Sequence, residues 1–424
     1  MIVVAHPTGS ANARMAAAEF ERLGLLDSFH VGLNIDLAHP LIRHLPENVL
    51  RHLRRRSYDL PQAKMRSFPM LEGTMLALEN LPGSPCCRLT HLYRHQLMNR
   101  YFDWRMSRAL HTIKSPVFYG FVGSCLQSAR TARKLGRLIV TEVTSVASTH
   151  HENLRLEAGL NPDWADSSSY LTDKNKTYQL NRQEEVFRLS DFLIAPSQYA
   201  AKCIPSDFQE KVIVANYPYS DCAAAVETAG AGAHAKLKIL FAGSLGQGKG
   251  LQYLKNALEA LDDQFELTLV GSASGTPCRE LAALLDGVTW YRTLPNRELR
   301  ALMGKQDVLV LPSISDSFGL VVTEALSQGT PVIVSENTGA KDRVVDGENG
   351  FVVPIRDAGA IAARLALLQN DRKLLARMSE RALAIAREEA GLPYLGKVID
   401  RLHDLLGQQR PSRFDRLASA ELAT

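Results

Sequence analysis

Short runs of β-branched and other apolar residues alternate along this chain with longer stretches whose apolar positions recur at helical spacing. Such alternation is typical of a parallel sheet flanked by helices. In the first half of the chain the pattern predicts strands at Ile2–Ala5, Pro116–Phe121, Leu138–Thr141 and Phe192–Ala195. The Arg-rich stretch between residues 40 and 108 contains several prolines and is less regular, and we interpret it as largely helical.

The same alternation becomes clearer in the second half of the chain. Strands are predicted at Leu237–Phe241, Glu266–Val270, Val288–Tyr291, Val308–Leu311, Pro331–Val334 and Gly350–Val353. Helices are predicted at Gly250–Ala260, Thr276–Leu285, Asn296–Met303, Phe318–Gln328, Ala358–Gln369, Arg372–Glu389 and Tyr394–Leu406. This rhythm favours an α/β, doubly wound nucleotide-binding domain, in which ligands bind beyond the carboxyl ends of the strands.

A length of 424 residues suits two domains, and the amino-acid composition changes in the segment between them. Residues 216–235 have no periodicity and many small side chains, so we interpret them as a linker, with a surface loop inside one domain as the alternative. The expected organisation is an N-terminal domain at 1–215 and a C-terminal domain at 236–390. A helix at 391–407 is expected to cross back to the N-terminal domain, and 408–424 form a tail.

Composition narrows the classes of function. The chain is 46% hydrophobic and 22% charged, and its net charge of +4 is too small to imply nucleic-acid binding. None of the six cysteines forms a CxxC pair or has zinc-ligand spacing, no apolar run approaches the ~20 residues of a membrane span, and Met1 leads directly into a strand. We expect a cytoplasmic protein without structural metal or signal peptide, with any membrane contact peripheral at the inner face.

The most informative segment follows the predicted strand that ends at Leu311. A short loop carries Asp316, and a helix begins near Phe318, where unpaired N–H groups favour an anionic ligand. Gly319 allows close approach to the backbone, and Glu324 lies about two helical turns after Asp316. The two carboxylates can therefore accept hydrogen bonds from separate hydroxyls of one elongated ligand. The alternative is that Asp316 only caps the helix and Glu324 faces solvent.

A second segment is a glycine-rich loop after the predicted strand at 237–241. It contains Gly243, Gly246, Gly248 and Gly250, with Lys249 as a point charge suited to a diphosphate. The loop does not have the Walker pattern, because glycine follows the lysine. By itself this loop is a weak signal.

Together the two segments resemble the family 4 retaining glycosyltransferases, which have the GT-B fold of two Rossmann-like domains facing across a cleft. The resemblance covers roughly residues 237–355. It is carried, in order, by motifs at Phe241–Gly250, Leu267–Gly271, Asp307–Ser313, Asp316–Glu324, Pro331–Gly339 and Val345–Pro354.

The resemblance implies a donor site in the C-terminal domain. Lys249 would bind the donor diphosphate, Asp316 the hydroxyls of the transferred sugar, and Glu324 the ribose. Further donor contacts would come from Gly243, Ser244, Gly271, Leu294, Phe318, Gly319 and Leu320.

The implied reaction moves a sugar, with retention, from a UDP- or GDP-type donor to a hydroxyl of a saccharide or lipid-linked acceptor, without cofactor or metal. Polysaccharide or glycoconjugate assembly is the expected setting.

Two positions depart from the family pattern. Ser244 stands where the family has an arginine, and Asp316 stands where it has the first glutamate. These changes keep two alternatives open: a catalytically idle GT-B protein that binds a nucleotide sugar, and a GT-B sugar phosphorylase or epimerase. A dinucleotide oxidoreductase is disfavoured, because the first strand–helix turn lacks the glycine fingerprint.

Three features of the N-terminal half are candidates for function. Gly9 follows the first strand, and in the resembling enzymes the matching loop faces the donor phosphates; an ordinary turn is equally compatible. His150 and His151 follow the strand near 138–141, and we favour His150 as the catalytic group near the sugar, with a solvent-exposed pair as the alternative. Basic residues at 43 and 51–56 suit an anionic lipid or a lipid-linked diphosphate, but we favour a solvated helix face as their explanation.

Overall fold

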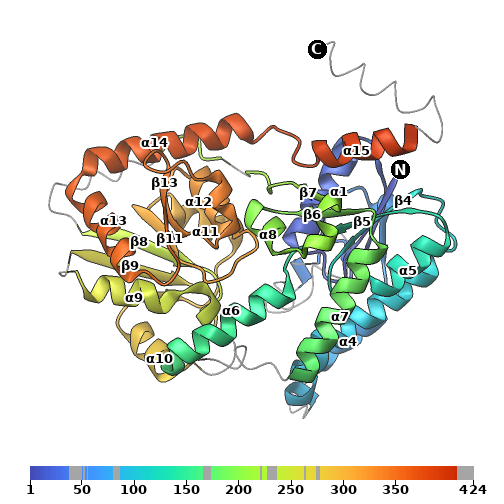
Figure 1. Ribbon diagram of the computed structural model, residues 1–424, viewed down its shortest axis with the longest axis horizontal. Coiled ribbons are helices and arrows are strands. Elements are labelled where there is room, and N and C mark those ends of the chain that lie inside the picture. The colour runs from blue at the N-terminus through green and yellow to red at the C-terminus, as the bar shows by residue number, and fades with distance from the viewer. Residues whose placement is uncertain are drawn as a thin grey trace.

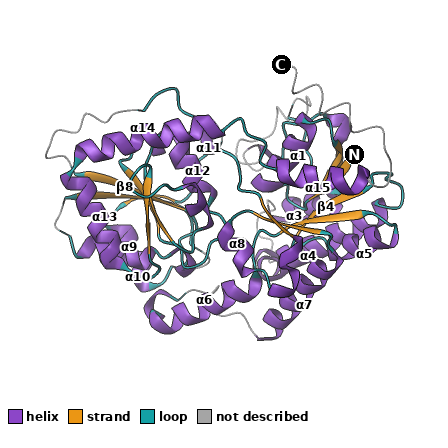
Figure 2. Ribbon diagram, turned by 45° about the horizontal axis from the view of Figure 1, so that its top comes forward, coloured by secondary structure: helices purple, strands orange, loops and turns teal. Residues whose placement is uncertain are grey.

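The computed structural model describes residues 1–37, 50, 53–54, 56–79, 86–165, 173–219, 222–226, 236–261, 264–273 and 277–407. Two parallel sheets occupy separate halves of the molecule, and helices lie on both faces of each sheet (Figures 1 and 2). Both faces are covered, so the central strands β1 (Ile2–Ala5) and β4 (Val117–Phe121) are buried at every residue.

The N-terminal sheet has the order β3-β2-β1-β4-β5-β6-β7, which reverses direction between β1 and β4. Its other strands are β2 (Leu26–Val31), β3 (Met65–Ser67), β5 (Leu138–Glu142), β6 (Phe192–Ala195) and β7 (Val212–Val214). Its helices are α1 (Ala11–Arg22), α3 (Pro69–Glu79), α4 (Cys86–Ala109), α5 (Leu126–Lys134), α6 (Ala147–Leu160), α7 (Asp173–Leu189) and α8 (Gln198–Cys203), with 3-10 turns η2 (Gln62–Lys64), η3 (Pro162–Trp164) and η4 (Ser206–Lys211).

The C-terminal sheet has the order β10-β9-β8-β11-β12-β13, with its reversal between β8 and β11. Its strands are β8 (Leu237–Ala242), β9 (Phe265–Val270), β10 (Thr289–Tyr291), β11 (Val308–Leu311), β12 (Val332–Ser335) and β13 (Gly350–Val353). Its helices are α9 (Leu251–Glu259), α10 (Arg279–Asp286), α11 (Asn296–Met303), α12 (Leu320–Ser327), α13 (Ala358–Asn370) and α14 (Arg372–Glu389), with turns η5 (Gln247–Lys249) and η6 (Gly339–Arg343).

The structure confirms every strand predicted in the C-terminal half, within one or two residues at each end. In the N-terminal half the periodicity missed β2, β3 and β7. Strand β2 carries Ser28 and His30 at buried positions on one face, with Ser28 Oγ 3.1 Å from His30 Nε2. Its sequence therefore lacks the continuous apolar run that marks a buried strand. The stretch from residue 40 to 108 is helical in α3 and α4 but also contributes β3.

Two segments cross between the halves. Helix α15 (Gly396–Gly407) returns to the N-terminal domain, where Leu395, Val398 and Leu402 join the core cluster around β1 (Figure 1). Helix α6 belongs to the N-terminal half but extends to the C-terminal domain, where it packs against η5. Trp164, which follows this helix, belongs to the C-terminal core. Each half therefore contributes a segment to the other.

Most of the predicted linker is either packed or outside the described residues. Tyr217 and Tyr219 are buried in the C-terminal core cluster, and the Ala223 amide donates to the Ser327 carbonyl at 2.8 Å. Residues 227–235, and the predicted tail at 408–424, lie outside the described residues.

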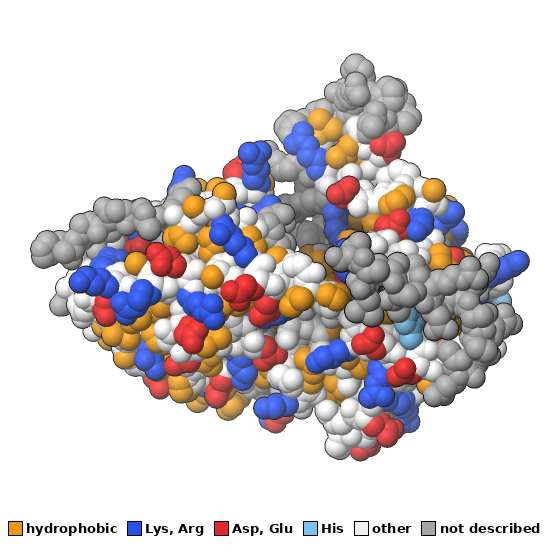
Figure 3. Space-filling model, turned by 90° about the horizontal axis from the view of Figure 1, so that it is seen from above, with side chains coloured by type: hydrophobic (Ala, Val, Ile, Leu, Met, Phe, Trp, Pro, Cys, Tyr) orange, Lys and Arg blue, Asp and Glu red, His pale blue; other side chains and the backbone are white. Residues whose placement is uncertain are grey.

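The surface carries charges of both signs. On the face over α14 and α15, basic and acidic side chains lie interspersed (Figure 3). Within the described part of the chain, no helix is long and apolar enough to cross a membrane.

Candidate active site

Two loops meet at the point where the C-terminal sheet reverses direction. The loop after β8 contains η5, and the loop after β11 contains Asp316. The Ile314 amide of the second loop donates to the Gly248 carbonyl of the first at 2.9 Å. The reversal of strand order is where doubly wound sheets bind ligands, and here a backbone hydrogen bond fixes the two loops together.

Lys249 and Asp316, 67 positions apart, form an ion pair at this junction, with Nζ against Oδ2. The other carboxylate oxygen of Asp316 accepts from the Phe318 amide at 3.3 Å. The backbone of Asp316 is also held, since its amide donates to the Asn337 carbonyl at 3.0 Å and its carbonyl accepts from the Gly339 amide at 2.9 Å. Asp316 therefore contacts both the lysine and the loop that precedes the helix.

Gly319 precedes helix α12, which begins at Leu320 and carries Glu324 on its second turn. Gly319 has φ +89°, and an added Cβ would lie 3.1 Å from a methyl carbon of Leu311, so both conformation and space favour glycine. Phe318 is buried edge-to-face against Tyr217, with ring centroids 4.9 Å apart. Burial raises the pKa of Glu324, and Arg300 partly opposes this rise.

A cavity of about 390 Å³ lies over this junction. That volume falls in the range of small-molecule sites. Its lining includes Gly243, Ser244, Lys249, Asp316, Phe318, Gly319, Leu320 and Glu324 from the C-terminal half, Asn12 and Thr144 from the N-terminal half, and Tyr217 from the segment between them. The cavity thus gathers eight of the residues that the sequence predicted for the donor site.

His150 lines an adjoining cavity of about 280 Å³ together with Ser244, Lys249 and Asp316. His151 is absent from the residues that line this cavity, so the two histidines face different surroundings. The pKa of His150 is lowered, mainly by burial and further by His151 and Lys249, while Asp316 opposes the shift. The imidazole is therefore neutral at pH 7 and can accept a proton or a hydrogen bond.

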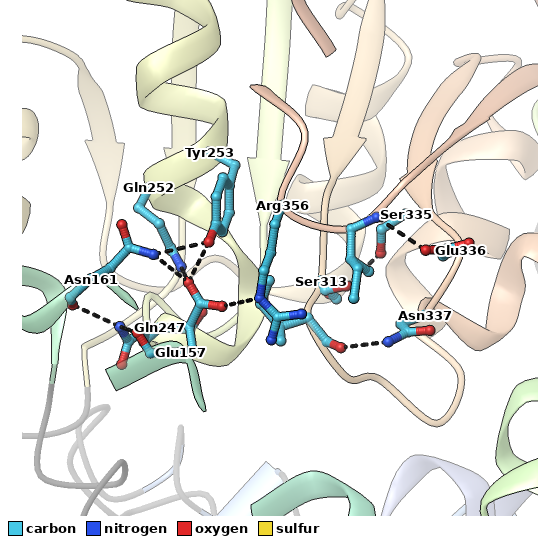
Figure 4. Close-up of polar contacts among 12 residues, drawn as sticks. Glu157, Asn161, Gln247, Gln252, Tyr253, Ser313, Ser335, Glu336, Asn337 and Arg356 are labelled. Atoms are coloured by element: carbon cyan, nitrogen blue, oxygen red, sulfur yellow. Dashed lines mark hydrogen bonds and ion pairs between the residues drawn. The ribbon is translucent and has the colours of Figure 1, made fainter. Parts of the chain in front are cut away.

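Helix α6, which carries His150, is attached to the C-terminal domain through a buried carboxylate (Figure 4). Glu157 is fully buried, and its Oε1 accepts from Asn161 Nδ2 at 2.6 Å, Tyr253 Oη at 2.7 Å and Gln252 Nε2 at 2.9 Å. Its Oε2 accepts from Arg356 Nε at 2.8 Å. Since three of these donors belong to the C-terminal domain, the N-terminal helix is held there by charge and hydrogen bonds.

The same helix also fixes the lysine loop. Gln247 Nε2 donates to the carbonyls of Glu157 at 3.0 Å and Asn161 at 2.9 Å. Gln247 is two residues before Lys249 within η5. The C-terminal end of α6 therefore positions the loop that contains Lys249. The same helix carries His150.

A second buried carboxylate lies beneath the cavity wall. Glu142, at the end of β5, accepts from Tyr119 Oη at 2.6 Å and from Tyr217 Oη, and Asn12 Nδ2 donates to Tyr217 Oη at 2.9 Å. Burial raises the pKa of Glu142. Because Asn12 and Tyr217 both line the cavity, this network orients side chains that the sequence analysis did not identify.

Three predicted site residues do not line the two cavities. An added Cβ at Gly9, whose φ is +54°, would lie 2.3 Å from a ring carbon of Tyr58, so packing explains this glycine. Asn12, in the first turn of the following helix α1, lines the cavity instead. Gly271 packs against the Gly243 carbonyl, and Leu294 is half-buried against the C-terminal core. Val270 and Leu299 line the cavity instead of these two.

The basic segment is only partly described. Residues 43, 51 and 55 lie outside the described residues, and Arg54 is exposed. Arg56 forms an ion pair with the buried Glu72 at 2.5 Å, so it stabilises the fold around α3.

Among the residues that the structure describes, no group of three or more His, Cys, Asp or Glu side chains is placed to hold a metal ion.

The C-terminal domain is similar in sequence to known proteins. Residues 230–384 match the family model described as Glycosyl transferases group 1. The C-terminal domain is therefore similar in sequence to group 1 glycosyl transferases. Over 157 residues the chain is 38% identical to D-inositol 3-phosphate glycosyltransferase of Xylanimonas cellulosilytica, covering 35% of this chain and 38% of that relative. Over 130 residues it is 35% identical to phosphatidyl-myo-inositol mannosyltransferase of Mycobacterium leprae, covering 29% and 34%. The matched segments thus span little more than a third of these relatives.

Solved structures relate the chain over nearly its whole length. HepE of Anabaena, solved with UDP and glucose, superposes with a TM-score of 0.60 at 17% identity, covering 95% of this chain and 99% of that one. Sucrose-phosphate synthase of Thermosynechococcus elongatus superposes with a TM-score of 0.62 at 15% identity, covering 96% and 99%. At such identities the likeness establishes the fold alone, which is GT-B, as the resemblance in the sequence led us to expect.

Proposed function

We propose that the protein transfers a sugar from a nucleoside diphosphate sugar to an acceptor hydroxyl, with retention at the anomeric carbon, as in family 4. The observation that carries the proposal is the gathering of Lys249, Asp316 and Glu324 around one cavity at the sheet reversal. A cation and two separated carboxylates match a diphosphate flanked by two hydroxyl-bearing sugars. The matched group 1 segment contains all three residues.

The nucleoside end of the donor would lie toward Glu324. When ionised, its carboxylate accepts hydrogen bonds from the ribose hydroxyls through both oxygens. Gly243 assists, because a Cβ at this position would meet nothing within 4 Å, and the ligand can therefore approach the backbone.

The diphosphate and sugar would occupy the end near Lys249. In the structure Lys249 is paired with Asp316, and donor binding would replace this contact by two others: Lys249 with the diphosphate, and Asp316 with the sugar hydroxyls. The backbone N–H groups that begin α12 supply further positive potential. Charge on the leaving group is thereby met by protein groups, and the proposed transfer needs no metal.

In the transfer itself, the acceptor oxygen forms a bond to the anomeric carbon while the bond from that carbon to the diphosphate oxygen breaks. The diphosphate leaves with the electron pair, and the hydroxyl proton passes to it on the same face of the sugar. Neutral His150, beside Lys249 and Asp316, would stabilise the reacting sugar by accepting a hydrogen bond.

The deciding experiment measures donor affinity and product formation. UDP, GDP and ADP sugars are screened by thermal shift, since a bound donor raises stability by mass action. Lys249→Ala and Glu324→Ala each remove a charged partner, so the affinity for the best donor should fall roughly ten- to a hundredfold. Lys255→Ala on α9 and Glu298→Ala on α11 serve as matched controls. Unchanged affinity in both site variants would refute the site.

Two further measurements separate the finer parts of the proposal. Proton NMR of the product should show an α-linked sugar from an α-linked donor, and an inverted product would contradict retention. Activity should survive a metal chelator; its complete loss would contradict metal independence. Donor binding without product from any acceptor would instead favour the catalytically idle alternative.

A further inference from the structure

The N-terminal domain contains another cavity, also about 390 Å³, which the donor site does not use. It lies at the carboxyl ends of β4 and β5, between α4 and α7. Its lining comprises Gln96, Asn99, Arg100, Val122, Gly123, Leu126, Ser145, Ala147, Tyr178, Gln179, Arg182, Gln183 and Val186. This is the edge of the sheet at which doubly wound folds bind ligands.

The side chains in this cavity suit a hydroxyl-rich anion. Four of them are primary amides, which both donate to and accept from hydroxyls, and two are guanidinium groups, Arg100 and Arg182. Among the described residues that line the cavity none is acidic. A guanidinium group without a competing acid pairs best with a phosphate or a carboxylate.

Arg182 is only loosely neutralised by the protein. Its Nη2 atom lies 3.9 Å from Asp103 Oδ2, beyond hydrogen-bonding distance. The Asp103 carboxylate is already satisfied, because it accepts from the Gln127 amide at 2.7 Å, the Ser128 amide at 2.8 Å and the Ser128 hydroxyl at 2.7 Å. The Nη1 atom of Arg182 donates to Tyr178 Oη at 3.4 Å, and because this partner is neutral the positive charge of Arg182 remains available to a ligand.

The cavity adjoins the reacting end of the donor site. Ser145 lines both this cavity and the one that contains His150. Gln183 holds the intervening turn, since its Nε2 donates to the Ser145 carbonyl at 2.7 Å and its Oε1 accepts from the Ala147 amide at 2.9 Å. A ligand seated between α4 and α7 would thus contact the turn that starts the helix of His150.

We propose that this cavity binds the acceptor, and that the acceptor is a polyol bearing an anionic substituent. The phosphate or carboxylate would pair with Arg100 and Arg182, the amides would hold its hydroxyls, and the hydroxyl to be glycosylated would extend past Ser145. The assignment of an acceptor role rests on the proposed function, whereas the binding of an anionic polyol does not.

Binding is tested by calorimetry on the whole protein saturated with UDP, which occupies the Lys249 site. Glucose 6-phosphate and glucuronate should each bind at least about tenfold more tightly than glucose, as expected for one charge-assisted pair. Arg182→Gln and the exposed Arg100→Gln should each abolish this preference while the affinity for UDP is unchanged. Arg188→Gln, on the same helix but with its side chain paired to Glu184, should keep it.

Several outcomes would overturn the proposal. One is equal binding of the three sugars together with no binding to phosphatidylcholine vesicles containing phosphatidylinositol. Another is a preference for the charged sugars that survives both arginine variants but is lost in Lys249→Ala, since the anion would then lie in the donor site. Vesicle binding that needs Arg100 and Arg182, without binding of the soluble sugars, would support the site and identify a lipid headgroup.

The failure of the proposed function would look different. If no nucleotide binds, the titrations are repeated without UDP on Lys249→Ala, so that the donor cavity cannot supply the charge. A charge preference that still depends on Arg100 and Arg182 would keep the anion site and remove only its acceptor role.

Discussion

Replacing Glu157 by glutamine tests whether a single buried carboxylate holds α6 to the C-terminal domain. The substitution keeps the size of the side chain and changes one acceptor oxygen into a donor. At Oε1, the remaining oxygen can still accept from its three partners. At Oε2, the new amide would face Arg356 Nε, so two donors would oppose each other at 2.8 Å and the guanidinium would lose its charge partner.

The size of the effect follows from burial. Glu157 has no exposed side-chain area, and the Arg356 side chain is 18% exposed. Breaking a buried ion pair by removing one partner costs about 3–5 kcal/mol. Because Arg356 retains some contact with water, we expect the lower end, about 3 kcal/mol, lost from the free energy of docking α6 on the C-terminal domain. This corresponds to roughly a hundredfold in the docking equilibrium.

Hydrogen exchange measures this docking directly, because it reports local opening that a global unfolding curve misses in a two-domain protein. The amides near the C-terminal end of α6 should exchange about a hundredfold faster in Glu157→Gln, and sugar transfer should fall because both His150 and the Lys249 loop depend on this helix. The matched control is Glu152→Gln, an exposed position on the same helix. Equal exchange in the two variants would refute the role of Glu157.

Three further predictions concern the core and the site. Gly271→Ala would put a Cβ 1.7 Å from the Gly243 carbonyl oxygen and should lower the free energy of unfolding by at least about 2 kcal/mol. Gly243→Ala meets no atom within 4 Å and carries only the strain of its positive φ of +153°, so it should destabilise the fold less and weaken UDP binding; thermal unfolding with UDP titration distinguishes the two variants. Burial and Arg66 lower the pKa of His30 to about 4, so below pH 6.5 the unfolded chain binds a proton that the folded chain does not, and acidification to pH 4 should cost about 3 kcal/mol. His30→Asn should flatten this dependence in denaturant titrations, and an unchanged slope would contradict the assignment. His150→Asn should lower kcat more than His151→Asn, since only His150 lines the cavity with Lys249; equal loss in steady-state assays would count against it.

Much of the C-terminal half, including the residues of its candidate site, could be predicted from sequence because its signals are local. Buried parallel strands read as apolar runs, and the glycines and Lys249 lie in one short loop after a strand. The strands and site residues of the N-terminal half were harder to predict. Strand β2 buries the polar residues Ser28 and His30, so it lacks the apolar run of a typical buried strand. Gly9 is required by the close approach of Tyr58, about fifty residues away, rather than by a ligand.

In the C-terminal half, the sequence alone determined the order of strands and helices, the loops at their carboxyl ends and the residue types that those loops present. Only the tertiary structure decided that Lys249 pairs with Asp316, that Asn12 and Tyr217 complete the cavity, and that Glu157 attaches an N-terminal helix to the C-terminal domain. The reason is physical. Periodicity records which face of an element is buried, whereas hydrogen bonds between residues tens of positions apart depend on how the two sheets pack, and local patterning does not specify that packing.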